Sequence, residues 1–297
     1  MEAYLNICRE ILDKGKKEKN RTGTDAYIVP IMLFRHDMKD GFPLLTTKKV
    51  AYGNVRSELE FFINGVTDKK WLQDRNNHIW NEWCTPMKIA YAHDDDTKAR
   101  MKEERDLGPL YGWQWRHFGA EYKGIEGIRD SDGMIISYEN KGIDQLSNLV
   151  DALKNAPDSR RILCMAWNPA DVDKVVPPFC HYGFQVDVVD GKLDLAWNQR
   201  SVDVPLGLPF NIASYGTLLH LLAKEAGLEE GILGGFLMNN QIYVDQVEGI
   251  EEQVSRKPKK LPKIETEKFG SVFDWNFMDT KIIGYDFHPA IKFPIAV

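Results

Sequence analysis

Residues 176–215 constrain the fold more tightly than any other stretch of the chain. Two alternating apolar runs, 184–189 and 192–197, are joined at Asp190-Gly191, a preferred turn for a tight β-hairpin. The second run leads through a Gln-Arg-Ser sequence at 199–201 into an apolar helix near residue 211. The stretch therefore predicts two paired strands and a helix that bring several polar groups together.

The polar residues of this stretch indicate a site for an anionic substrate. Cys180 near arginines has its thiolate favoured, and the thiolate is the nucleophilic form, although a buried structural cysteine is the competing interpretation. Arg200 and Ser201 suit a phosphate or carboxylate, whose oxygens match the guanidinium fork. Asn211 carries both a donor and an acceptor for the edge of an amide-like base, or it only caps the helix.

A second candidate group lies on a helix predicted over residues 54–64. Val55, Leu59, Phe62 and Ile63 share one face of it. Glu58 and Glu60 lie about 200° apart around the helix, so they cannot share a face. One of the two acids is expected to point inward and to have a raised pKa, and the alternative is two solvated glutamates.

The remaining segments predict an α+β fold with a large mixed sheet and flanking helices. Helices are expected at 3–16, 143–155, 211–226 and 241–255, and strands at 27–35, 162–167, 272–277 and 281–285. Pro30 inside a strand implies an edge or a bulge. Helices and strands alternate without a regular βαβ rhythm, which favours one domain over residues 1–297, with an exposed insertion at about 84–106.

Composition narrows the functional classes. A hydrophobic content of 43% and a charged content of 28% are typical of a soluble globular protein, and the net charge of -6 argues against indiscriminate nucleic-acid binding. No apolar run approaches a membrane span and no signal peptide is visible. Four cysteines without CxxC spacing favour reduced thiols in the cytoplasm. Cys180 and His181 have no partner cysteine or second close histidine at ligand spacing, which argues against a zinc site.

Taken together, the motifs resemble the thymidylate synthase family over nearly the whole chain. The matching segments occur in the family's order: NRTGT at 20–24, FPLLTTKK at 42–49, SELEFFINGVT at 57–67, HIWNEW at 78–83, LGPLYGWQWRHFG at 107–119, SRR at 159–161, FCH at 179–181, QRSVDVPLGLPFNIASY at 199–215 and IKFPIAV at the end. The resemblance implies that family's single-domain fold and a homodimer that packs sheet to sheet.

The resemblance also implies roles for individual residues. Cys180 would attack C6 of dUMP, with Glu58 managing protons and Tyr111, His181, Arg200, Asp203 and Asn211 completing the catalytic set. The nucleotide would further contact Arg21, Gln199, Ser201, Gln241 and Tyr243, with Arg160 and Arg161 donated by a second subunit. The co-substrate 5,10-methylenetetrahydrofolate would meet Lys48, Ile79, Trp80, Trp83, Asp203, Gly207, Phe210 and Val297, and neither a metal nor a nicotinamide would be needed.

Four departures from the family pattern leave alternatives open. Glu60 stands where synthases usually have leucine or isoleucine, Phe179 replaces a proline, Gln241 replaces a histidine and Asn198 replaces a tyrosine. An added acid near the site could favour water attack, which would make the chain a dUMP hydroxymethylase that releases tetrahydrofolate. A non-catalytic nucleotide- or RNA-binding homologue is the third hypothesis.

Overall fold

The computed structural model of the chain describes residues 1–20, 22–125, 128–129, 135–137 and 142–295. The chain divides into two units. The first contains Met1–Tyr52, Gln185–Lys268 and the residues from Met278 onward, and the second contains Gly53–Phe184 and Phe269–Phe277. Both mix helices and strands, so the predicted α+β class is confirmed.

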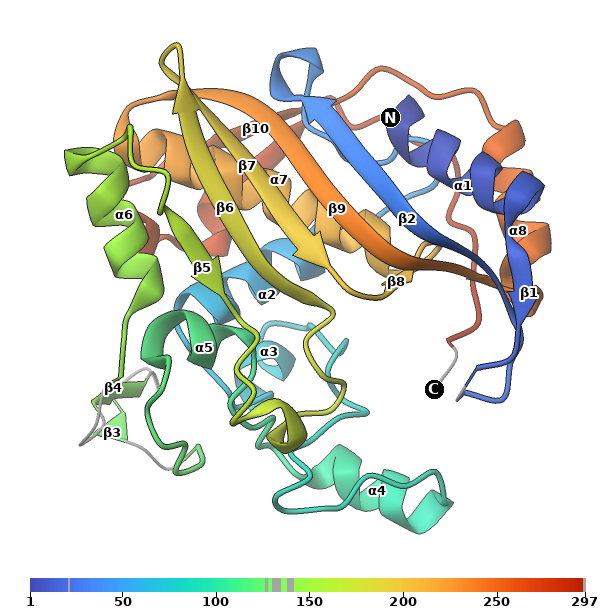
Figure 1. The fold of residues 1–297 in the computed structure, drawn as a ribbon, viewed down its shortest axis with the longest axis horizontal. Helices are drawn as coiled ribbons and strands as arrows, with labels where there is room; N and C mark the ends of the chain where they lie inside the picture. Colours follow the sequence, from blue (N-terminus) through green and yellow to red (C-terminus); the bar gives the residue numbers. More distant parts are fainter. Residues whose placement is uncertain (21, 126–127, 130–134, 138–141, 296–297) are drawn as a thin grey trace. The chain divides into compact units, whose positions relative to one another are not determined.

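The first unit contains most of the main sheet and the helices α1, α7 and α8 (Figure 1). Its elements in chain order are α1 (Glu2–Lys14), β1 (Lys16–Glu18), β2 (Ala26–Asp37), η1 (Met38–Asp40), β6 (His181–Val189, whose first residues belong to the second unit), β7 (Lys192–Gln199), β8 (Val202–Asp203), α7 (Gly207–Ala226), β9 (Glu229–Tyr243), η3 (Val244–Gln246), α8 (Val247–Ser255), β10 (Lys263–Thr266) and β11 (Thr280–Ile283).

Within the described residues the main sheet has seven strands in the order β1-β2-β9-β7-β6-β5, with β8 also paired to β9. Strand β2 runs antiparallel to β9, whereas β7 and β8 run parallel to it. The sheet is therefore mixed, as predicted. The expected hairpin joins β6 to β7, and its turn residues Asp190 and Gly191 both take positive φ, at 56° and 75°.

Proline 30 marks the point where β2 becomes an edge strand. Strand β1 pairs only with residues 26–28 of β2, so the proline costs no hydrogen bond on that side. The pairing with β9 also skips from Val29 to Ile31. The prediction of an edge position is confirmed for this part of the strand.

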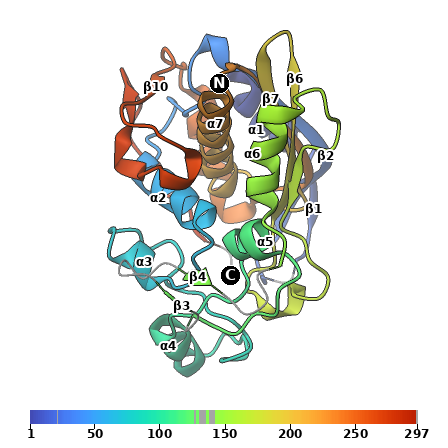
Figure 2. The ribbon, with the colours of Figure 1, turned by 90° about the vertical axis from the view of Figure 1, so that its left-hand side faces the viewer.

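Helix α7 covers one side of the sheet in the first unit (Figure 2). Tyr215 of α7 stacks on Trp197 of β7 with ring centroids 5.3 Å apart, and Phe34 of β2 lies 5.7 Å from the same indole. The helix is buried on nearly all sides, which explains its almost continuous run of apolar residues. It ends at Gly227, whose left-handed conformation (φ 67°) is the usual helix terminator.

The second unit is built around aromatic side chains on short helices. Its elements are α2 (Tyr52–Ile63), α3 (Lys70–Gln73), α4 (Asp95–Glu103), α5 (Tyr111–His117), β3 (Ile128–Arg129), β4 (Ile135–Ser137), α6 (Gln145–Asn155), β5 (Leu163–Met165), η2 (Val172–Lys174) and η4 (Val272–Asp274), with η5 (Phe277–Asp279) beginning at its boundary. Phe62 is central to the core, because its ring contacts those of Phe61, Tyr111 and Trp115.

Two predicted elements are wrong. Residues 241–243 belong to β9 rather than to a helix, because Ile242 pairs with Tyr27 of β2, and α8 begins only at Val247. Residues 272–277 are not a strand: Val272–Asp274 form a 3-10 helix whose N-cap, Ser271, accepts a hydrogen bond from the Phe273 N–H. Val272 and Trp275 are both buried, at the three-residue spacing of such a helix.

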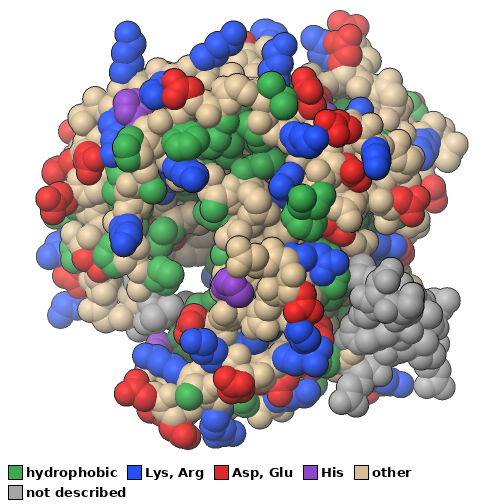
Figure 3. Space-filling view, turned by 180° about the vertical axis from the view of Figure 1, so that it is seen from behind, with side chains coloured by type: hydrophobic (Ala, Val, Ile, Leu, Met, Phe, Trp, Pro, Cys, Tyr) green, Lys and Arg blue, Asp and Glu red, His purple; other side chains and the backbone are tan. Residues whose placement is uncertain are grey.

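Charged side chains of both signs are interspersed over the face seen from behind (Figure 3), in keeping with the modest net charge. Over the described part of the chain, no helix combines the length and the apolar character that a bilayer crossing requires. Nor do the described residues include a group of three or more His, Cys, Asp or Glu side chains that would hold a metal ion.

Candidate active site

The predicted site residues fall into two groups, one in each unit. The second unit carries the group around the cysteine: Cys180, His181, Tyr111, Glu58, Ile79, Trp80, Trp83, Arg160 and Arg161. The first unit carries the amide- and arginine-rich group: Lys48, Gln199, Arg200, Ser201, Asp203, Gly207, Phe210, Asn211, Gln241 and Tyr243. Arg21 and Val297 lie outside the described residues. Each group has its own internal geometry.

Cys180 lies directly before β6, among aromatic rings. Its backbone N–H donates to the Tyr111 hydroxyl at 2.8 Å, and its Sγ lies 3.7 Å from the Pro178 carbonyl oxygen. The residue is partly exposed, whereas Cys8, Cys84 and Cys164 are buried. The structure therefore favours the reactive interpretation of Cys180 over that of a buried structural cysteine.

Tyr111, His181 and Phe179 form a packed wall beside the cysteine. The His181 imidazole stacks on the Tyr111 ring with centroids 4.2 Å apart and planes 7° from parallel. Phe179 is fully buried and meets Tyr111 edge-on at 5.3 Å, which gives this departure from the family pattern a packing role. Burial lowers the pKa of His181 to about 3, so the imidazole is neutral at physiological pH.

Glu58 on α2 is the acid that meets these rings. Its Oε1 accepts a hydrogen bond of 2.7 Å from the Trp80 indole N–H, and Trp80 packs edge-on against Tyr111 at 6.4 Å. Burial raises the pKa of Glu58 to about 7, and the Trp80 N–H opposes part of that rise. The carboxyl can therefore exchange a proton near neutral pH, which a general acid or base must do.

Glu60 has a different environment. It is buried, and its Oε2 accepts a hydrogen bond of 2.8 Å from the backbone N–H of Phe277. Arg56 of the same helix lies over the Phe277 ring at 5.4 Å. Neither glutamate of the pair is a solvated acid: Glu58 contacts the indole of Trp80, and Glu60 holds the segment that contains Phe277. The alternative of two solvated glutamates is therefore wrong, and both acids, rather than one, are withdrawn from water.

Asn211 belongs to a chain of amide hydrogen bonds in the first unit. The Trp197 indole N–H donates to Gln199 Oε1 at 3.1 Å, and Gln199 Nε2 donates to Asn211 Oδ1 at 3.1 Å. Helix α7 begins at Gly207 and its N-cap is Leu206, so Asn211 is not the helix cap. Gln199 thus fixes which way round the Asn211 amide lies, leaving its Nδ2 as the donor end.

Ser201 and Gln241 are joined beside Arg200. Gln241 is buried, and its side-chain Nε2 donates to Ser201 Oγ at 3.2 Å. Its backbone carbonyl accepts from the Val204 N–H at 3.0 Å. Arg200 is partly exposed at the end of β7, and Tyr243 is buried at the end of β9. The glutamine that departs from the family pattern therefore supports the serine that follows Arg200.

The residues expected to meet the folate lie in both units. Asp203 accepts from the Leu206 N–H at 3.0 Å and from Gln246 at 3.4 Å, and burial raises its pKa to about 6. Lys48 donates to the Pro205 carbonyl, and burial lowers its pKa to about 8. A Cβ placed on Gly207 would lie 3.9 Å from both Asn211 Oδ1 and Asp203 Cβ. Phe210 is partly exposed in the first turn of α7.

In the second unit, Ile79, Trp80 and Trp83 share one turn, and Trp83 packs 5.9 Å from Tyr91. Arg160 and Arg161 are both exposed in a turn before β5. The exposed position of the two arginines leaves them accessible, as the prediction of donation to another subunit requires.

Three residues of these groups were not singled out as site residues by their sequence. Phe62, on the same face of α2 as Glu58, touches the rings of Tyr111, Trp80 and His181. Its i+4 spacing from Glu58 was a usable signal. Gln246 donates both to Asp203 and to the Pro294 carbonyl, and Lys69 supports the Trp80 turn. Neither residue belongs to a pattern that sequence reading could detect.

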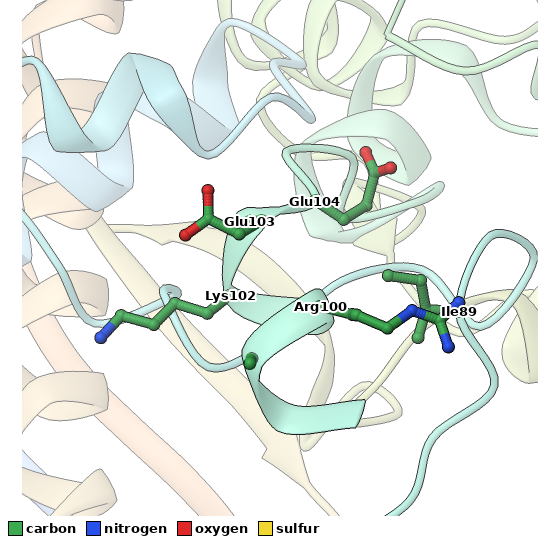
Figure 4. A pocket seen from close by; sticks show the side chains of 6 residues that line it. Ile89, Arg100, Lys102, Glu103 and Glu104 are labelled. Carbon is green, nitrogen blue, oxygen red and sulfur yellow. The ribbon is translucent and has the colours of Figure 1, made fainter. Parts of the chain in front are cut away.

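A hollow of about 630 Å³ beside α4 shares no lining residue with either group. It is lined by Ile89, Ala99, Arg100, Lys102, Glu103 and Glu104. Arg100 and Lys102 point in opposite directions there, and the two glutamates point away from the helix (Figure 4). Because its polar groups do not converge, this hollow is not a candidate active site.

Comparison with known proteins agrees with the geometry. The family model described as thymidylate synthase matches residues 2–297. Thymidylate synthase 1/2 of Encephalitozoon cuniculi is 40% identical over 293 residues, which cover 97% of this chain and 95% of that relative. Thymidylate synthase of Corynebacterium aurimucosum is 39% identical over 294 residues, which cover 99% of this chain and 97% of that relative. The chain belongs to the thymidylate synthase family.

Proposed function

We propose that the chain catalyses the reductive methylation of dUMP at C5, with 5,10-methylenetetrahydrofolate as co-substrate and dTMP and dihydrofolate as products. Membership of the family supports the reaction. The observation that carries it is the group of Cys180, Tyr111, His181, Trp80 and Glu58, which joins a partly exposed thiol to an acid that titrates near neutrality.

The cysteine starts the reaction. The Cys180 thiolate forms a bond to C6 of the pyrimidine, and the electrons of the C5=C6 bond move to C5. C5 then attacks the one-carbon unit, and the bonds from that carbon to the folate nitrogens break as it is transferred. The folate supplies that carbon and the hydride that reduces it to methyl. The proton on C5 leaves, and the S–C6 bond breaks to release the nucleotide. Glu58, with a pKa of about 7, is suited to these proton transfers, and neutral His181 stacked on Tyr111 keeps a second charge away from the ring.

The first unit's group serves recognition. Arg200 and Ser201 hold the phosphate, because a guanidinium and a hydroxyl match its oxygens. Asn211, oriented by Gln199, presents its donor to the uracil O4 side, whereas an acid at this position would favour cytosine. Tyr243 contacts the ribose, and Arg21, Arg160 and Arg161 complete the phosphate site.

The folate is assigned to Lys48, Asp203, Gly207 and Phe210, with Ile79, Trp80, Trp83 and Val297. The donor set fits: Asp203 is an acceptor for pterin N–H groups, Lys48 is a cation for the glutamate tail, and the indoles provide flat apolar surface. The raised pKa of Asp203 and the lowered pKa of Lys48 both result mainly from burial. Both side chains are therefore already largely desolvated before a ligand binds.

The sheet face of the first unit supports the homodimer. Ile31 and Leu33 on β2 are 59% and 71% exposed, and Phe236 of β9, which pairs with Leu33, is 39% exposed. Three large apolar side chains on one sheet are typical of a covered surface. Leu33→Glu should give monomers in sedimentation, whereas Ile283→Glu on β11 should not; a dimeric Leu33→Glu protein would contradict this interface. The four free thiols support a reducing compartment, and the cytoplasm is proposed.

The product decides between this reaction and its alternatives. Purified protein is incubated with dUMP and methylenetetrahydrofolate, the nucleotide is weighed by mass spectrometry, and dihydrofolate is followed by absorbance. A methyl product with dihydrofolate supports the proposal. A hydroxymethyl product with tetrahydrofolate would establish the hydroxymethylase, although the hydrogen bond from Phe277 to Glu60 already gives that acid a structural role. Nucleotide binding without turnover would indicate a binding protein.

A further inference from the structure

Lys69 is a buried cation that the proposed reaction does not use. Its side chain is fully buried, and its Nζ donates to three backbone carbonyls: Asn81 at 2.9 Å, Trp83 at 2.9 Å and Met101 at 2.8 Å. An ammonium has three N–H donors, so these contacts satisfy it completely. Three convergent carbonyl dipoles offset part of the cost of burying the charge.

The two carbonyls at 81 and 83 place Lys69 under the turn that carries Trp80. Inside this turn the Asn81 N–H bonds to the His78 carbonyl and the Trp83 N–H bonds to the Trp80 carbonyl. At its start, Asn77 donates to the Ser57 hydroxyl and the Asn54 carbonyl of α2. The turn is therefore anchored at both ends, by Asn77 on one side of Trp80 and by Lys69 on the other.

The third carbonyl connects the same ammonium to the insertion. Met101 is a buried residue of α4, and the Lys69 backbone N–H also bonds to the Arg105 carbonyl at 3.0 Å. An ion pair between Arg105 and Asp68, the residue before Lys69, joins the same two segments. Lys69 thus ties together the Trp80 turn and the segment that carries α4.

We propose that Lys69 is a positioning residue for the acid Glu58: by holding the carbonyls of Asn81 and Trp83, it keeps the Trp80 indole N–H on the Glu58 carboxylate. The proposal rests on the proposed function for its catalytic readout. The bond from Trp80 to Glu58 is 2.7 Å long. On the C-terminal side of that indole, the Lys69 ammonium holds the backbone carbonyls and Gln73 Nε2 donates to the Asn81 side chain at 2.9 Å.

Lys69 and Glu58 each have a pKa shifted mainly by burial. Glu82, Glu103, Glu104 and Cys84 act on Lys69 electrostatically, and burial lowers its pKa. The Trp80 N–H lowers the pKa of Glu58, against the larger effect of burial. Loosening the turn removes that hydrogen bond, so the Glu58 titration should move to higher pH.

The test compares Lys69→Met with Lys70→Met, a neighbouring exposed lysine paired with Asp74 at 2.6 Å. The Lys69 variant should lower kcat by about tenfold to a hundredfold, the range that small misplacements cause, with KM for dUMP unchanged. Its kcat–pH profile should shift to higher pH, as it should in a Trp80→Phe variant. The variant that combines Lys69→Met with Trp80→Phe should show no further shift. Lys70→Met should leave all three unchanged. A folded Lys69→Met protein with a wild-type pH profile would overturn the proposal.

Two further measurements keep the outcome decisive. In the wild-type protein, the Trp80 indole N–H and the Lys69 ammonium protons should exchange through one opening event, with protection factors that agree within about threefold. Clearly different opening free energies would contradict the coupling even if Lys69→Met does not fold. If the wild type does not turn over dUMP, the proposed function fails, but the positioning role can still be tested. Faster exchange of the Trp80 indole N–H in Lys69→Met than in Lys70→Met supports that role, whereas equal exchange overturns it.

Discussion

The two groups of site residues use different physical means. Around Cys180 and Glu58, stacked and edge-on aromatic rings exclude water, so the pKa of Glu58 rises to about 7 and that of His181 falls to about 3. Around Asn211, a chain of neutral hydrogen bonds runs from the Trp197 indole through the Gln199 amide and fixes the orientation of the Asn211 amide. The aromatic surroundings set the pH at which Glu58 and His181 gain or lose a proton. The hydrogen-bond chain sets which donor and acceptor groups of a ligand Asn211 can recognise.

Because of this difference, substitutions in the two groups should change different measured quantities. Substitutions among the rings should act on kcat and on pH dependence, because they alter protonation and the nucleophile. Substitutions in the amide chain should act on affinity, because they leave a donor or acceptor unmatched.

Cys180→Ser should lower turnover by at least about a thousandfold and abolish release of the C5 proton, because a hydroxyl is a far weaker nucleophile than a thiolate. Binding of dUMP, measured by calorimetry, should persist. Cys164→Ala, which changes a buried thiol of the same unit, is the control and should keep its turnover. Retained proton release in Cys180→Ser would break the assignment of chemistry to this group.

Glu58→Gln should abolish proton transfer and stabilise the protein at high pH. The pKa of Glu58 rises from 4.5 to about 7 on folding, so the folded state holds a proton that the unfolded chain releases between these values. Wild-type stability should therefore fall as pH rises through this window, by up to about 3 kcal/mol, and the glutamine variant lacks that loss.

The measurement for Glu58 is the free energy of unfolding in urea at pH 4.5, 6 and 8. The advantage of Glu58→Gln should be absent at pH 4.5 and largest at pH 8, and the exposed Glu103→Gln should show none. A pH-independent difference would mean that burial does not control this acid.

Asn211→Ala should raise the dissociation constant for dUMP by about tenfold to a hundredfold, because the base edge and Gln199 both lose a partner. The kcat of the saturated enzyme should change much less. Ser214→Ala, one turn further along α7, should leave the affinity unchanged. If Asn211→Ala mainly lowered kcat, the distinction between the two groups would fail.

Glu60→Leu should cost only about 1–2 kcal/mol of stability, because it leaves the Phe277 N–H without this carboxylate acceptor. The ratio of methyl to hydroxymethyl product should stay as in the wild type, whereas Glu60→Gln should recover most of the stability. A changed product ratio would bring Glu60 into the chemistry and sharpen the boundary of the cysteine group.

Much of the fold was predictable because local patterns agreed with tertiary packing. Helix α7 is apolar almost all round and is buried, and Asp190-Gly191 forms the expected turn between β6 and β7. Prediction failed at residues 241–243, where the apolar spacing suits a helix but pairing with β2 decides for a strand. It also failed at Val272–Asp274, where the cap at Ser271 favours a 3-10 turn.

The residue sequence by itself determined the inventory: a cysteine before a strand, two glutamates on opposite faces of α2, and an asparagine in an amide-rich run, because periodicity and residue chemistry are local properties. Only the tertiary structure decided which glutamate meets the aromatic rings, which way round the Asn211 amide lies, and that Lys69 is buried beneath the Trp80 turn. These depend on hydrogen-bond partners 12 to 32 residues away along the chain, and no local pattern specifies such partners.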